Sequence, residues 1–167
     1  MSAAKPQRPR GGRPRTGARV AAVQALFQSE QSGETAETVL DQFIRHRLGA
    51  GGAEGGFEDG MAPEADARLF ARIVRGAAAN GDALDEAIRT LLAKEWTLER
   101  IDPVLRALLR AAGAELMEPR EPPARVVINE YLDVAAGFLD AEATRFANGV
   151  LDALAHLLRP TEFGARA

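Results

Sequence analysis

The residues best suited to binding chemistry in this sequence stand at its beginning. The first 19 residues contain six basic side chains and no acidic one, and prolines and glycines among them oppose a helix. The remaining residues carry the other 15 of the 21 basic side chains against all 24 acidic ones. A basic arm on an acidic body is typical of proteins that neutralise a phosphate backbone and release its counterions. A disordered tail that only keeps the chain in solution explains this composition equally well.

A second candidate site lies in the stretch "RFANGVLDAL", residues 145–154. Asn-Gly between apolar runs usually signals a β-hairpin, but the apolar residues here recur at helical spacing, so we expect a helix that continues through Gly149. Glycine inside a helix costs about 1 kcal/mol relative to alanine, which suggests that another group approaches closely. Phe146 falls at the edge of the apolar stripe. There it either offers a flat face to a nucleobase or seals the rim of the core.

The composition argues against several classes of protein. The chain has no cysteine, which rules out disulfides and thiolate metal sites, and its two histidines, His46 and His156, are too few for a typical metalloenzyme. No apolar run approaches the roughly 18 residues of a membrane span, and the N-terminus lacks the apolar core of a signal peptide. We therefore expect a cytoplasmic protein without a cofactor.

Apolar residues recur at helical spacing along most of the chain, and no segment alternates as a strand would. This pattern predicts an all-α fold of about seven helices in two small subdomains. We expect a disordered arm over residues 1–15, a helical domain over 16–160 with a flexible glycine-rich loop at about 49–62, and a tail over 161–167.

Capping signals place several of the helix ends. Asp102 followed by Pro103 predicts a helix start, because aspartate accepts from the free N–H groups of the first turn and proline costs nothing at the first position. Asp140 predicts the start of the last helix in the same way. The pair Asn80-Gly81 is expected to end a helix.

Four segments, in order over about residues 15–160, carry a resemblance. They are "RVAAVQALFQ", "LERIDPVLRALLRAAGAEL", "VVINEYLDVAAGF" and "RFANGVLD". Together they resemble the NusB family of bacterial transcription antitermination factors, and the N-E and F-x-N-G-V-L motifs are the most specific of them. The sequence departs from the family pattern at Leu139, where the family usually has glycine, and at Ala114, where it usually has an aromatic residue.

The resemblance implies an all-helical protein that binds the boxA element of nascent RNA together with NusE, a small-subunit ribosomal protein that doubles as a transcription factor. The pair would join NusA, NusG and RNA polymerase and suppress premature termination, chiefly on ribosomal RNA operons. It implies neither catalysis nor a cofactor.

The resemblance also implies site residues. Arg15 and Arg19 align with basic N-terminal positions of the family, Phe146 with an aromatic that contacts RNA, and Glu142 with an acidic position near it. Arg13 extends the basic run. These five residues are the predicted RNA-binding set.

NusE would contact the start of the helix that follows Asp102 and the segment before it, and we expect Trp96, Arg100 and Leu105 to take part. Asn129, in the N-E motif, is expected either to satisfy helix ends as a buried amide or to act at the site.

Two alternatives remain open from the sequence. Enzymes that methylate cytosine in ribosomal RNA resemble NusB over an N-terminal domain, but this sequence has no cysteine nucleophile and no glycine-rich cofactor loop. A helical scaffold that binds only proteins would use the same faces and leave the basic arm without a role.

Overall fold

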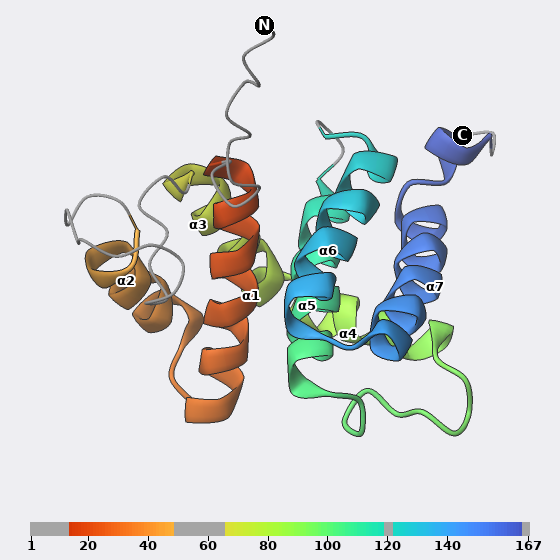
Figure 1. Ribbon diagram of the computed structural model, residues 1–167, viewed down its shortest axis with the longest axis horizontal. Coiled ribbons are helices and arrows are strands. Elements are labelled where there is room, and N and C mark those ends of the chain that lie inside the picture. The colour runs from red at the N-terminus through yellow and green to blue at the C-terminus, as the bar shows by residue number, and fades with distance from the viewer. Residues whose placement is uncertain (1–13, 49–65, 119–121, 165–167) are drawn as a thin grey trace, which may run out of the picture.

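The computed structural model describes residues 14–48, 66–118 and 122–164. In this part of the chain the regular structure is helical, which confirms the all-α prediction. The elements are α1 (Pro14–Ser32), α2 (Ala36–His46), α3 (Ala67–Ala79), α4 (Gly81–Leu91), α5 (Pro103–Met117), α6 (Ala124–Phe138), α7 (Ala141–Leu158) and a short 3-10 helix, η2 (Pro160–Phe163). Figure 1 shows α1, α2 and α3 on one side of the molecule and α7 on the other, with α5 and α6 between them.

The predicted caps at two helix starts are confirmed. Asp102 Oδ1 accepts a hydrogen bond from the Val104 N–H at 2.7 Å, and Pro103 takes the first position of α5. Asp140 Oδ1 accepts from the Ala143 N–H at 2.8 Å at the start of α7. Each aspartate satisfies a donor that has no partner within its helix.

The pair Asn80-Gly81 ends α3 as predicted, although not through a left-handed glycine. The Asn80 backbone N–H and its side-chain Nδ2 each donate to the Gly76 carbonyl at 3.0 Å. Gly81 does not adopt a positive φ, because α4 begins at this residue without an intervening turn.

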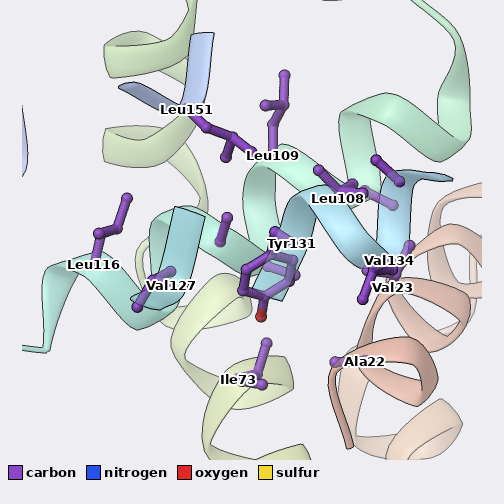
Figure 2. Packing of buried hydrophobic residues seen from close by; sticks show 14 of the residues in the cluster. Ala22, Val23, Ile73, Leu108, Leu109, Leu116, Val127, Tyr131, Val134 and Leu151 are labelled. Atoms are coloured by element: carbon purple, nitrogen blue, oxygen red, sulfur yellow. The ribbon is translucent and has the colours of Figure 1, made fainter. Parts of the chain in front are cut away.

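The hydrophobic core is continuous from α1 to α7 and centres on α5, which packs against α1, α3, α4, α6 and α7. Figure 2 shows the middle of this core, where Tyr131 of α6 lies among apolar side chains of the neighbouring helices. A Cβ atom on Gly113 of α5 would lie 2.7 Å from Leu84 Cδ2, so glycine there lets α4 pack closely. Since α5 contacts helices from both ends of the chain, it fixes their surfaces relative to one another.

Two predicted boundaries need correction. Helix α1 begins at Pro14, so Arg15 lies in its first turn rather than in a disordered arm, because proline at a helix start loses no hydrogen bond. The predicted tail includes the ordered helix η2, which follows Arg159. The Arg159 guanidinium donates to the carbonyls of Glu115 and Leu116, each at 2.9 Å, and ties this end of the chain to α5. The rest of the predicted arm and the glycine-rich loop lie outside the described residues.

Candidate nucleic-acid interface

Two predicted site residues from different parts of the chain meet at the surface of α7. The rings of Phe146 and Trp96 lie 6.1 Å apart between centroids, with planes inclined at 52°. Phe146 is half-buried and packs on the core, whereas 52% of Trp96 is exposed. The sequence assigned the two rings to different partners, and the structure joins them in one surface, which we call the aromatic pair.

The turn between α4 and α5 presents Trp96. Leu98 and Ile101 anchor the turn in the core, with 1% and 4% of their surfaces exposed. The backbone N–H of Trp96 donates to the Ala93 carbonyl at 2.9 Å. Arg106 of α5, itself buried, donates from Nη1 to the Leu98 carbonyl at 2.9 Å and to the Ile101 carbonyl at 3.2 Å. The position of Trp96 therefore depends on side-chain contacts rather than on a helix.

The outer face of α7 continues the aromatic pair. Glu142, Phe146 and Gly149 follow one another at intervals of four and three residues and so share a face, and both Glu142 and Gly149 are exposed. We expected Gly149 to mark close approach of another group. Among the described residues nothing lies within 4 Å of a Cβ built on Gly149, so no neighbouring helix requires glycine there.

The basic residues at the start of α1 divide into two kinds. Arg15 is exposed. Arg19, predicted to bind RNA, is only 2% exposed and forms a two-pronged ion pair with Glu115 of α5, with Nε and Nη2 donating at 2.8 and 2.9 Å. Glu130 of α6 lies 3.5 Å from its Nη1. This corrects the prediction, because the donors of Arg19 point into the protein.

Electrostatics keep Arg19 charged in this position. Burial alone would lower the pKa of Arg19, but the hydrogen bonds and charge of Glu115 outweigh it and raise the pKa. The neighbouring Tyr131 hydroxyl is buried and has no hydrogen-bond partner among the described residues. Burial raises the pKa of Tyr131 well above its usual value, so the hydroxyl stays protonated. These groups form a structural cluster beneath the surface.

A shallow pocket next to this cluster adds one basic residue that the sequence analysis missed. Arg15 and Arg72 line the pocket together with Arg19, Glu115 and Glu118. Arg72 is an exposed residue of α3, a helix that packs against α1. Only the packing of α3 on α1 brings Arg72 to Arg15, so nothing in the local sequence signals it.

The residues predicted to contact NusE differ in their exposure. Arg100 is exposed on the turn that carries Trp96. Leu105 is only 4% exposed and belongs to the core, which removes it from any surface that a partner could touch. Leu105 lies on the inward, apolar face of the first turn of α5. Arg13 lies outside the described residues.

Residues 14–48, 66–118 and 122–164 contain no group of three or more histidine, cysteine or acidic residues placed to hold a metal ion. None of their helices combines the length and apolar character needed to cross a membrane.

Surface aromatic rings and exposed arginines are the side chains with which proteins bind single-stranded RNA. Comparison with known proteins identifies the family. The sequence model of the NusB family matches residues 16–156, and the chain belongs to this family. The transcription antitermination protein NusB of Granulibacter bethesdensis is 58% identical over 151 residues, which cover 90% of this chain and 93% of that protein.

Solved structures agree with the fold. NusB of T. maritima superposes with a TM-score of 0.72 at 28% identity, over 91% of this chain and 98% of that one. A crystal structure of the antitermination factors NusB and NusE in complex with dsRNA contains a chain with a TM-score of 0.67 at 21% identity, over 85% of this chain and 96% of that one. At that identity the second likeness supports the fold.

Proposed function

We propose that this protein is a cytoplasmic transcription antitermination factor that binds boxA RNA together with NusE and joins NusA, NusG and RNA polymerase on ribosomal RNA operons. The observation that carries the proposal is membership of the NusB family, with a relative named as an antitermination protein at 58% identity. No catalytic step is part of this function.

The surface residues supply the two contacts that single-stranded RNA needs. Aromatic rings stack on unpaired bases, and cationic side chains follow the backbone. Phe146 presents a half-exposed ring, and Arg145 beside it is exposed. Arg15 and Arg72 offer cations at the start of α1 and on α3. We expect Arg13 and the rest of the basic arm to add phosphate contacts.

NusE would bind near the turn between α4 and α5. The exposed Arg100 supports this placement. Because Leu105 is buried, the contact with NusE would stop at the turn and not include the first turn of α5 at that residue. Glu142 would lie at the edge of the RNA surface, where a carboxylate accepts from the exocyclic amines of bases.

The match to an antitermination protein over 93% of that protein's length favours this function over that of a methyltransferase domain. The scaffold alternative differs from it in one respect, since a protein-only scaffold would not bind RNA.

Binding of labelled boxA RNA across a salt series, with and without NusE, tests the proposal. We expect the logarithm of the affinity to fall linearly with the logarithm of salt concentration, and NusE to strengthen binding by about 1–3 kcal/mol. Deleting residues 1–13 should lower the salt slope by up to about one unit for each lost phosphate contact. Absence of RNA binding in both the presence and the absence of NusE would contradict the proposal and leave the scaffold standing.

A further inference from the structure

The aromatic pair contains one ring that the proposed function has not assigned to RNA. Trp96 is the single tryptophan of the chain, and 52% of its surface is exposed although it lies against the ring of Phe146. An indole this exposed offers a large flat face at the surface, and tryptophan is enriched where proteins contact their partners.

The geometry of the pair determines how a base can bind. A centroid separation of 6.1 Å with a 52° tilt is that of two rings in contact, so no base fits between them. Bases can stack only on the outward faces. One face belongs to Trp96 and the other to Phe146, and the open space at Gly149, one turn beyond Phe146, leaves room for a nucleotide to approach the helix.

Arg106 holds Trp96 in this place. Its Nη1 donates to the carbonyls of Leu98 and Ile101, which close the turn after Trp96. Its Nε donates to Glu30 of α1 at 3.0 Å, and Nη2 also donates to Glu30, so the guanidinium is fixed on both sides. The neighbouring Arg110 shares Glu30, but its hydrogen bonds in the described structure go to Glu30 and Asp85 and not to the turn.

We propose that Trp96 is a second base-stacking residue of the RNA surface and that Arg106 is the positioning residue that keeps its ring beside Phe146. The proposal rests on the proposed function, since it concerns the same RNA, but it takes Trp96 from the NusE surface and gives it to the RNA. The continuity of its ring with Phe146 favours a base over a protein as the occupant.

Fluorescence of the single tryptophan tests this directly, with boxA RNA added to the full chain alone and to the chain already bound to NusE. A stacked base quenches indole emission, so RNA should quench Trp96 in both cases, including when NusE already occupies the turn at Arg100. If RNA binds by anisotropy of a labelled strand while the emission is unchanged, the stacking role is refuted and the proposed function stands. If wild-type protein binds no RNA at all, both are refuted.

Two substitutions at Trp96 separate the contribution of a flat aromatic ring from that of apolar volume. Trp96→Leu keeps an apolar side chain but no flat face, and should weaken RNA binding about tenfold, within the range for one stacked base. Trp96→Phe keeps a ring and should stay within about twofold of wild type. If Trp96→Leu instead weakens NusE binding and leaves RNA binding unchanged, Trp96 belongs to the protein surface and the proposal is overturned.

The positioning role is tested with Arg106→Gln against the matched control Arg110→Gln. Both remove an arginine that pairs with Glu30, but only the first removes the donors to the turn. Arg106→Gln should make Trp96 more accessible to acrylamide and weaken RNA binding several-fold, and Arg110→Gln should change neither. If Arg106→Gln does not fold, Arg106→Lys replaces it, because lysine keeps the positive charge. Arg106→Lys should give a smaller change in the same direction. Unchanged acrylamide quenching in the folded Arg106 variants would refute the positioning role.

Discussion

Both ends of α1 form ion pairs with α5, but the two sets of ion pairs lie in different surroundings. Near its start, Arg19 is paired with Glu115 and approaches Glu130, and both the arginine and Glu115 are almost wholly buried, with 3% and 5% of their side chains exposed. The cluster fastens α1 to α5 and α6. It has no exposed donor left for a ligand, although its arginine carries a charge that the sequence pattern assigned to RNA.

Near the end of α1, Glu30 pairs with Arg106 and Arg110 of α5, and Arg110 also pairs with Asp85 of α4. These side chains are more exposed, up to 28% for Glu30, and the cluster extends through Arg106 to the turn that carries Trp96. On the proposal above, the Arg106 pair also holds the surface turn of Trp96, whereas the Arg19 pair only fastens helices to one another. The following predictions test this difference.

Arg19→Met should give the largest change in stability. It leaves the Glu115 carboxylate buried without its partner, which costs about 3–5 kcal/mol of unfolding free energy. Urea denaturation measures this loss. The double variant Arg19→Met with Glu115→Leu should recover most of it, because no charge is then left unpaired. If Arg19→Met keeps its stability and loses RNA binding, the buried pair is not the role of Arg19.

Acid should weaken the ion-pair cluster at the end of α1, because it protonates the Glu30 carboxylate. Partial burial alone would raise the pKa of Glu30, but the hydrogen bonds and charges of Arg106 and Arg110 outweigh it and lower the pKa below its usual 4.5. A lowered folded-state pKa gives stability that is fully present above pH 4.5 and is lost as the pH falls through the folded value.

Urea denaturation at a series of pH values between 7 and 3 should therefore show a smaller acid loss for Glu30→Gln than for wild type. The control is Glu37→Gln, whose exposed pair with Arg75 also lowers the pKa of Glu37 through a hydrogen bond but is screened by water. Equal acid profiles for wild type and Glu30→Gln would show that the cluster at this end adds no stability.

Tyr131→Phe should give the smallest change. The hydroxyl lies beside the Arg19 cluster without a hydrogen-bond partner among the described residues. Its removal relieves a desolvated polar group, so we expect the free energy of unfolding to rise by up to about 1 kcal/mol. Thermal and urea unfolding measure it. A marked loss of stability would mean that the hydroxyl belongs to the ion-pair cluster.

Local signals in the sequence were enough to predict most of the fold. Asp102 with Pro103 and Asp140 place helix starts because a cap acts within four residues of its own position. The apolar stripe of α7 places Phe146 at the edge of the core for the same local reason. The start of α1 at Pro14 was missed because the glycines and prolines before it dominated the pattern.

The site could be predicted only in part, because much of it depends on contacts between distant residues. Arg19 and Glu115 are 96 positions apart, and no spacing rule shows that they pair. The same holds for Arg72 beside Arg15, and for Trp96 beside Phe146. The expectation of a close neighbour at Gly149 is wrong for a related reason, since the sequence does not show which face of α7 its neighbours cover.

The most direct test of the central claim, that the aromatic surface of α7 binds RNA, is the affinity of the Phe146→Ala variant for labelled boxA RNA across a salt series. The account predicts a loss of about 1–3 kcal/mol in binding at every salt concentration, as for one stacked base. The salt slope should stay unchanged, because no phosphate contact is lost. Circular dichroism should show a folded protein, since the ring is half-buried. RNA affinity equal to that of wild type in this folded variant would contradict the account.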